Sequence, residues 1–127
     1  MKRLRLIPTL LAAFTTLRSF SIGDPRIKGR IHFIMGLDAL DAGKLARALT
    51  HLRRAVDLEP ELSKARLALG KGLLEMAEPE EAMEHLQIVL ETEPANAEAQ
   101  LALAASMAMD RLQRKGALPE AEPSPPN

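Results

Sequence analysis

Residues 63–96 have the sequence SKARLALGKGLLEMAEPEEAMEHLQIVLETEPAN, with two segments of helical periodicity separated by Glu78-Pro79 and closed by Glu93-Pro94. The same marks recur 34 residues earlier in the chain. A fixed period of this length, with two helical segments per unit, is typical of helical-repeat arrays, so the sequence predicts an all-α repeat domain. The shift pairs identical residues: Gly36 with Gly70, Ala48 with Ala82, Leu52 with Leu86, and Pro60 with Pro94.

The composition favours helices and excludes several kinds of site. Of the 127 residues, 46% are hydrophobic but only 2% are aromatic, so a core must be built mainly from aliphatic side chains. Such a mixture, with few β-branched runs, favours helix over strand. The absence of Cys excludes disulfides, thiolate metal sites, a cysteine nucleophile and a lipidated cysteine.

The net charge of zero conceals two halves of opposite sign. Residues 1–54 carry 11 Lys and Arg against 3 acidic residues, a net charge of +8. Residues 55–127 carry 6 against 14, a net charge of −8. In an elongated array this polarity favours head-to-tail contacts or a polarised partner, and the alternative interpretation is two solvated faces of uneven composition.

Turn and cap residues divide the chain into five expected helices, at about 26–42, 44–58 and 62–77, from Pro79 toward the break at Glu93-Pro94, and at about 96–115. Ser63 is expected to cap the third of these helices, and Gly43 and Gly116 are expected to follow helix ends. Residues 117–127 are Pro-rich, which predicts a disordered tail. Apolar stripes are expected on the outer helices, with Ile31, Ile34, Met35 and Ala39 on the first and Leu101, Leu103, Ala104, Met107 and Leu112 on the last.

Three interpretations of residues 1–25 concern targeting or membranes. The basic start and the apolar run from Leu6 to Leu17 fit a secretory signal, but Arg18 follows directly and no small-x-small cleavage site is evident. The absence of acids before Asp24 fits a mitochondrial presequence. A membrane span is disfavoured, because the apolar run has about 12 residues and a span needs about 20.

The fourth interpretation comes from the repeat and is the one we favour. Aligning Pro25 with Pro60 matches AFTTLRSFSIGDP (13–25) with ALTHLRRAVDLEP (48–60), so that Ala13 falls on Ala48 and Leu17 on Leu52. Residues 1–25 would then hold a retained helix, equivalent to the second helix of a half-repeat. A retained helix favours the cytoplasm, whereas a targeting segment would imply export or an organelle.

These residues resemble the tetratricopeptide repeat family, a right-handed α-solenoid of 34-residue helix-turn-helix units. The resemblance covers about residues 29–115, within a domain expected at 26–116. It implies repeats at 29–62 and 63–96 and a capping helix at 97–115, where Leu103-Ala104 marks a third unit that stops after its first helix. The motif positions are Leu69-Gly70, Ala82, Leu86, Val89 and Pro94 in one unit and Met35-Gly36, Ala48, Leu52, Ala55 and Pro60 in the other.

Two features of the packing follow from the motif. Gly36 and Gly70 are expected to let the helices of each pair approach closely, with Ala48 and Ala82 opposite them. Where the family usually has aromatic residues in the first helix, this chain has other side chains, which makes it a Leu- and Ala-packed version. These positions are His32 and Ala39, Arg66 and Leu73, and Gln100 and Met107.

No catalytic, metal or cofactor motif emerges. His32, His51 and His85 are the only histidines and are expected to be solvated. There is no Ser/His/Asp spacing, no Gly-rich phosphate loop and no HExxH. Nucleic-acid binding is disfavoured because basic residues lack interleaved aromatics and the second half is acidic.

In this family the first helix of each unit lines a concave binding surface. The resemblance therefore implies a non-catalytic interaction module, such as an adaptor or assembly factor, whose mostly apolar groove suits an amphipathic helix or an extended apolar segment. The basic set that holds a terminal carboxylate in some members is missing. The expected lining is Arg30, Phe33, Leu37, Leu40, Lys64, Leu67, Lys71, Leu74, Glu98, Leu101, Ala105, Ala108 and Met109.

Several ligands for this groove stay open. An external protein or peptide, a second copy of the chain, and residues 4–20 of the chain itself each fit its apolar character. A rival hypothesis from another class is a membrane-associated or exported protein, anchored or targeted by its basic, apolar N-terminus.

Overall fold

The computed structural model describes residues 23–116 and 119–121. Within them the chain is all α-helical and contains no strand. The helices are α2 (Pro25–Asp41), α3 (Leu45–Leu58), α4 (Ser63–Glu75), α5 (Pro79–Thr92) and α6 (Ala97–Arg114). The helix expected within residues 1–22 and most of the expected tail lie outside the described residues.

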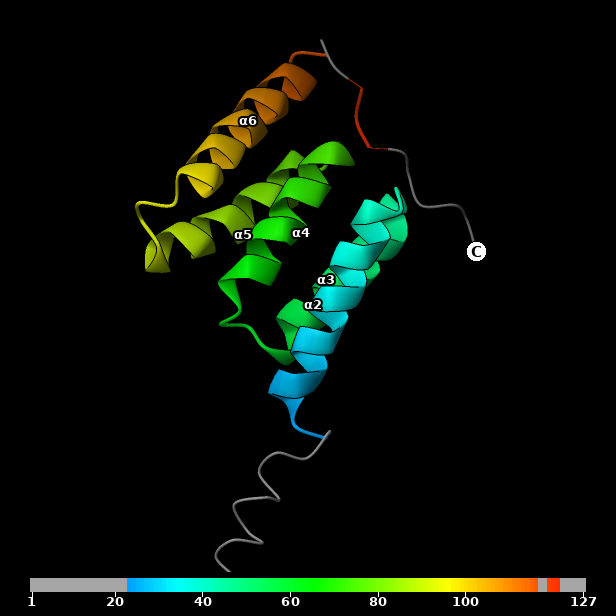
Figure 1. Ribbon diagram of the computed structural model, residues 1–127. Helices are drawn as coiled ribbons and strands as arrows, with labels where there is room; N and C mark the ends of the chain where they lie inside the picture. Colours follow the sequence, from blue (N-terminus) through cyan, green and yellow to red (C-terminus); the bar gives the residue numbers. More distant parts are fainter. Residues whose placement is uncertain (1–22, 117–118, 122–127) are drawn as a thin grey trace, which may run out of the picture.

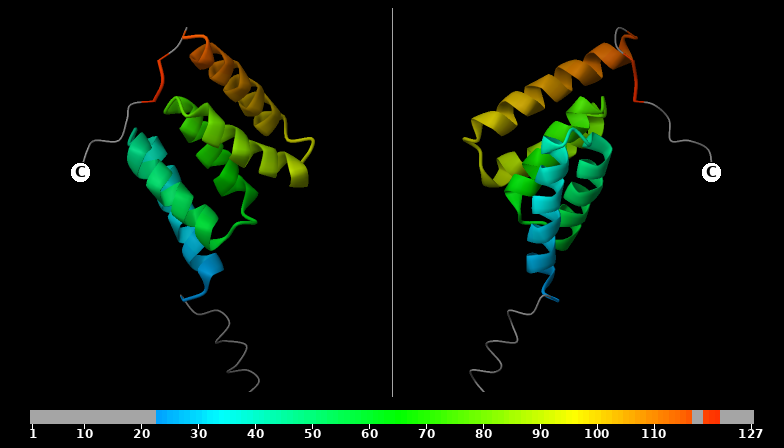
Figure 2. Two further views of the ribbon diagram at one scale, coloured as in Figure 1. Left: turned by 180° about the vertical axis from the view of Figure 1, so that it is seen from behind. Right: turned by 45° about the vertical axis from the view of Figure 1, so that its right-hand side comes forward.

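The helices are arranged as successive hairpins (Figures 1 and 2). α2 packs against α3, and α4 packs against α5. The second hairpin stacks on the first through α3 and α4, and α6 packs on α5 and α4 at the end of the array opposite the start of α2. This is the arrangement of an all-α helical repeat, and the five expected helices are found within one or two residues of their predicted ends.

Side-chain caps define two helix starts, and one predicted cap is wrong. The Asp24 side chain accepts a hydrogen bond from the backbone N–H of Arg26 at 2.9 Å, and Asn96 accepts one from Ala99 at 3.0 Å. Ser63 does not cap α4, because it is the first helical residue and the N-cap is Leu62, which makes no side-chain cap bond. The Ser63 hydroxyl lies instead 3.5 Å from the hydroxyl of Thr92 on α5.

The turns that end α2 and α4 share one backbone geometry. Gly43 has a φ of 73°, and its N–H bonds to the carbonyl of Leu40 while the next N–H bonds to that of Ala39. This paired pattern is the Schellman motif, which requires a left-handed residue after the helix. At the equivalent place after α4 stands Ala77, with a φ of 59° and the same pair of bonds.

The core lies between the hairpins and depends on close helix contacts. Leu52, Leu69, Leu73 and Leu86 are fully buried, together with Ala48 and Ala82. A Cβ placed on Gly36 would lie 2.8 Å from the Leu52 side chain, and one on Gly70 would lie 2.8 Å from that of Leu86. The expectation that these glycines permit close approach within each pair is confirmed.

The apolar stripes expected on the outer helices are largely exposed. Of the α2 stripe only Ala39 is buried, whereas Ile31, Ile34 and Met35 are 45%, 64% and 40% exposed. On α6 the buried residues are Ala99, Ala102 and Ser106, while Leu101, Met107 and Leu112 are 74%, 48% and 41% exposed. Among residues 23–116 and 119–121, each outer helix has helical neighbours on one side, and part of its apolar surface is left uncovered by the described residues.

Candidate functional site

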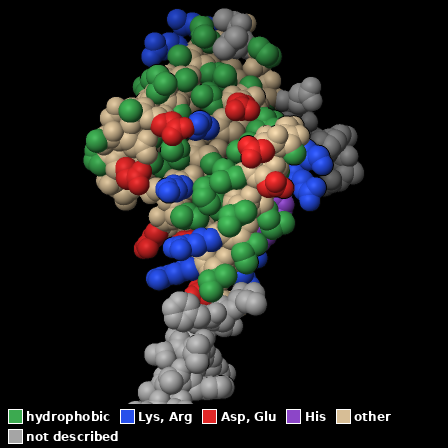
Figure 3. Space-filling view, viewed as in Figure 1, with side chains coloured by type: hydrophobic (Ala, Val, Ile, Leu, Met, Phe, Trp, Pro, Cys, Tyr) green, Lys and Arg blue, Asp and Glu red, His purple; other side chains and the backbone are tan. Residues whose placement is uncertain are grey.

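A groove with a volume of about 600 Å³ runs between α2 and α4. Its floor is apolar, and its residues come from the first helix of each hairpin. Figure 3 shows hydrophobic side chains on this face of the molecule, interspersed with charged ones. The apolar lining consists of Phe33, Leu37 and Leu40 from α2 and Leu67, Ala68 and Gly72 from α4.

The position of α4 beside the first hairpin depends on a glycine. A Cβ on Gly72 would lie 2.6 Å from Cδ2 of Leu49 on α3, so a larger residue there would displace the Leu49 side chain or move the helix outward. Because Gly72 permits this contact, α4 packs closely on α3. The adjacent face of α4 then lies toward α2. Contact between the repeats therefore brings Leu37 and Leu67 into the same groove.

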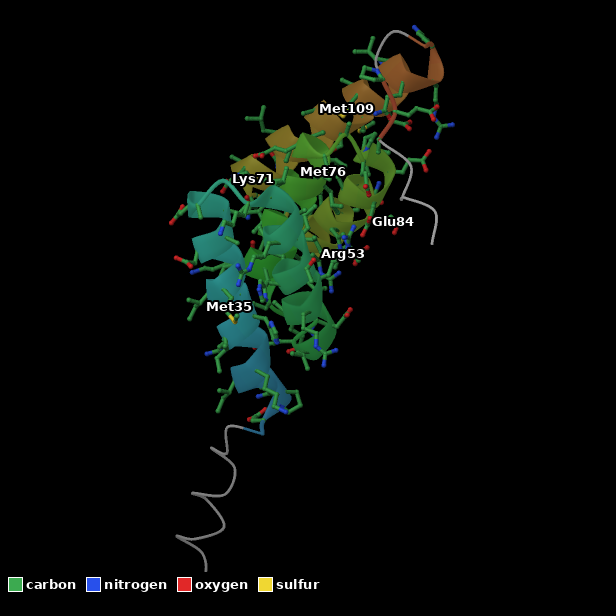
Figure 4. All side chains as sticks on the ribbon, turned by 90° about the vertical axis from the view of Figure 1, so that its right-hand side faces the viewer. Met35, Arg53, Lys71, Met76, Glu84 and Met109 are labelled. Atoms are coloured by element: carbon green, nitrogen blue, oxygen red, sulfur yellow. The ribbon has the colours of Figure 1, made fainter. Side chains whose placement is uncertain are left out.

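The rim of the groove carries charges of both signs. Lys71 of α4 and Glu98 of α6 form an ion pair, so α6 contributes to one edge. Figure 4 shows Lys71 on the side of α4 that lies toward the end of α2. The side-chain amide of Asn96 donates to Glu93 Oε2 at 2.9 Å, while Lys64 and Glu75 make no ion pair within residues 23–116 and 119–121.

The structure brings together about half of the residues predicted to line the groove. The residues that line it are Phe33, Leu37, Leu40, Lys64, Leu67, Lys71 and Glu98.

The other predicted residues lie elsewhere. Arg30 lines an adjacent hollow and pairs with Glu59 on the segment after α3, at 3.4 Å. Leu74 is partly buried against the core. Leu101, Ala105, Ala108 and Met109 lie on α6 outside the groove, since the contribution of α6 to its lining is Glu98.

Sequence reasoning missed several groove residues. Ala68 and Gly72 are small residues beside the predicted positions of α4, and their spacing could have indicated them. Glu93 and Asn96 come from the turn between α5 and α6, where helical periodicity gives no guidance. Ser63 and Glu75, at the two ends of α4, complete the lining.

The histidines are paired rather than simply solvated, which corrects the expectation. Nδ1 of His32 and Nδ1 of His51 are 3.2 Å apart and their rings stack, which joins α2 to α3. In the next repeat, Nη1 of Arg66 lies 3.2 Å from Nδ1 of His85. Since a guanidinium can only donate, this nitrogen of His85 accepts and carries no proton.

These surroundings favour neutral imidazoles. Burial, with Arg66 alongside, lowers the pKa of His85, and burial together with His51 and Arg54 lowers the pKa of His32. No group of three or more His, Asp or Glu side chains converges as a metal site would require within the described part of the chain. The His32–His51 and Arg66–His85 pairs are contacts between the two helices of each hairpin.

A further polar contact joins the two hairpins. Nη2 of Arg53 on α3 lies 3.0 Å from Oε2 of Glu81 on α5, and Nε of Arg53 lies 3.3 Å from Oε1 of the same carboxylate. This two-pronged hydrogen bond lowers the pKa of Glu81 and raises that of Arg53. The pair helps to set the orientation of one repeat on the next.

Comparison with family models matches residues 39–106 to the tetratricopeptide repeat, which is more than half of the 127 residues. The chain belongs to the tetratricopeptide repeat family. Repeats of this family generally mediate protein–protein interaction and are typically non-catalytic. A comparison with curated proteins finds no match.

The described helices are also informative about membranes. None of them within residues 23–116 combines the length and the apolar character that a membrane span requires.

Proposed function

We propose that this protein is a small interaction module that binds an amphipathic helix, or an extended apolar segment, of another protein in the groove between α2 and α4. The apolar floor is the observation that carries the proposal. Leu37 is 39% exposed, and Phe33 and Leu67 are also partly exposed. Apolar side chains gathered in a concave surface are typical of a binding site.

The dimensions of the groove suit a short helix. Its volume of about 600 Å³ lies within the usual range of about 300–1,000 Å³ for ligand sites. The lining residues of α4 run from Ser63 to Glu75, which corresponds to about 18 Å along a helix at 1.5 Å per residue. A partner segment of about three helical turns would cover this length with leucine-like residues at three- and four-residue spacing.

The rim adds a polar requirement to the partner. Lys64 and Glu75 lie near opposite ends of the α4 lining, and neither is engaged in an ion pair within residues 23–116 and 119–121. A partner with an acidic side chain near Lys64 and a basic one near Glu75 would satisfy both groups. Charges at a rim of this kind select orientation and speed of association more than affinity.

A binding experiment with designed peptides tests the groove directly. The probes are a helical peptide with leucines at three- and four-residue spacing and a scrambled peptide of the same composition, measured by titration calorimetry against the full chain. Leu37→Asp places a carboxylate on the groove floor and should weaken binding of the helical peptide at least about tenfold, because a charge would be buried without a partner. Ile88→Asp is the matched control, since Ile88 is 41% exposed on α5 and outside the groove.

The wild-type protein and the Ile88→Asp variant should bind the helical peptide with equal affinity and should show no binding of the scrambled peptide. Equal binding by Leu37→Asp would exclude the groove as the site. A melting temperature that falls sharply in Leu37→Asp but not in Ile88→Asp would indicate that the chain fills its own groove, which would also contradict the proposal.

A further inference from the structure

α6 repeats the register and bonding of α4, although the segment that would complete its hairpin is not among the described helices. Nη2 of Arg66 donates to the carbonyl of Pro60 at 2.9 Å, and 34 residues later Nε2 of Gln100 donates to the carbonyl of Pro94 at 2.7 Å. Ala99 is fully buried, as is its counterpart Ala65. α6 is therefore the first helix of a third repeat rather than a cap of different construction.

The face of α6 that would receive a second helix is open within the described part of the chain. In the first two repeats, Gly36 is covered by Leu52 and Gly70 by Leu86. The equivalent residue of α6, Ala104, is exposed. Figure 3 shows hydrophobic side chains over α6. We define the α6 face as the exposed residues Ala97, Gln100, Ala104 and Met107, the counterparts of the α4 residues Ser63, Arg66, Gly70 and Leu73.

The other end of the array is also uncovered by any of the residues that the structure describes. Ile31 and Met35 of α2 are 45% and 40% exposed, whereas their counterparts on α4, Ala65 and Leu69, are fully buried. Ala65 and Leu69 lie on the side of α4 that also carries Gly72, and Gly72 packs against Leu49 of the preceding repeat. Figure 4 shows Met35 on the first described helix and Met109 on the last, toward opposite ends of the array.

One stretch of the chain has the pattern of a repeat's second helix, which the described residues after α6 do not supply. Residues 13–25 align with the second helix of a repeat, so that Leu17 takes the place of Leu52 and Leu86, the side chains that cover the glycines. This segment joins the array at the start of α2, at the end opposite α6 (Figure 1). Its attachment therefore favours the α6 face of another molecule over that of its own chain.

We propose that residues 13–22 of a second copy dock on the α6 face and complete the third repeat, so that copies of this protein join head to tail. The contact uses a surface different from the α2–α4 groove and goes beyond the proposed function. The opposite net charges of residues 1–54 and 55–127 add a complementary, salt-sensitive attraction between the two ends.

One detail of the α6 face differs from the other repeats. Ala104 carries a Cβ where Gly36 and Gly70 have none, and at those glycines a Cβ would come within 2.8 Å of a leucine side chain. The atoms concerned are Cγ and Cδ2 of the leucine, so the incoming helix with Leu17 would sit slightly farther from α6 than α3 and α5 sit from their partners. Because the two surfaces of the contact are different, association is not limited to a dimer and produces longer chains unless a ring closes.

Sedimentation velocity of the full chain tests the proposal. Interference optics are required because the protein has no Trp or Tyr. The average mass should rise above 13.9 kDa as the concentration increases from about 1 µM to about 1 mM, the range in which contacts of moderate affinity form. The rise should be smaller at high salt. A wild-type protein that stays monomeric throughout this range would overturn the proposal.

Paired variants distinguish a head-to-tail contact from a symmetric one. Ala104→Glu blocks the α6 face and Leu17→Glu blocks the docking segment, so each variant alone should associate at least about tenfold more weakly than the wild type. Mixed in equal amounts, they should form a dimer and no larger species, because each supplies the surface that the other retains. Ala105→Glu is the matched control, exposed on α6 but outside the α6 face, and should associate like the wild type.

Other results would refute the head-to-tail contact. Association of Leu17→Glu at the wild-type level would indicate a symmetric α6–α6 dimer or another interface, and a mixture that stays monomeric would show that the two surfaces do not meet. Far-UV circular dichroism checks that each variant is folded. Should Ala104→Glu unfold, Met107→Glu, at a position 48% exposed on the same face, replaces it with the same expected outcomes.

Discussion

The turn after α4 should be more stable with glycine than with its natural alanine. Ala77 has a φ of 59°, in the left-handed region where a Cβ costs about 1–2 kcal/mol. Replacing it with glycine removes that cost but gives the unfolded chain more freedom, which offsets about 0.4–1 kcal/mol. Loss of a partly buried methyl group offsets a few tenths more. We expect Ala77→Gly to raise the free energy of unfolding by about 0.5 kcal/mol.

The turn after α2 provides the reverse experiment. Gly43 has a φ of 73°, and a Cβ built on it meets nothing within 4 Å, so Gly43→Ala tests the backbone cost without a steric contribution. Alanine there adds the cost of the left-handed conformation but also restricts the unfolded chain, so Gly43→Ala should lower the free energy of unfolding by about 1 kcal/mol. In a domain of this size, 1 kcal/mol corresponds to a change of about 4–8 °C in melting temperature.

Urea and thermal unfolding followed by far-UV circular dichroism measure both effects. Ala105→Gly is the control, because Ala105 is exposed in the interior of α6 and glycine there should lower stability by about 1 kcal/mol. The same Ala-to-Gly change should thus have opposite signs at positions 77 and 105. If Ala77→Gly were destabilised as much as Ala105→Gly, the backbone argument would be wrong.

Three further predictions concern the helix contacts. Ala82→Leu should lower the free energy of unfolding by about 1–3 kcal/mol in a urea titration, because Ala82 is fully buried, and unchanged stability would contradict the close packing. Since the pKa of His85 is lowered in the fold, stability should be complete above its ordinary value and fall as the pH drops below it. His85→Gln, which can still accept from Arg66, should reduce this acid loss in melts at several pH values; an unchanged pH dependence would exclude His85 as a cause. Arg53→Gln removes a partly exposed ion pair with Glu81 and should lower the free energy of unfolding by less than about 1 kcal/mol. Parallel urea titrations of the wild type and the variant should show a smaller difference at high salt. A difference that did not change with salt would contradict an ionic origin.

The locally encoded parts of the fold are well predicted from sequence. The 34-residue period, the Pro and Gly punctuation and the small residues at fixed places predict two hairpins and a fifth helix with ends close to those observed. Helix periodicity and turn geometry depend on residues that are neighbours in sequence. The candidate groove is predicted in part, because its apolar side chains follow the same period on α2 and α4.

Tertiary structure decided which of the predicted surfaces are covered. The apolar stripes of α2 and α6 are helically spaced, yet Ile34 and Leu101 are 64% and 74% exposed because no described helix covers the outer sides of α2 and α6. The pairing of His32 with His51 and of Arg53 with Glu81 likewise depends on how helices are placed in space. The sequence by itself determined where each helix begins and ends and which positions repeat, since those depend on local chain geometry. Burial and pairing depend on which helices lie alongside, and only the assembled array supplied that.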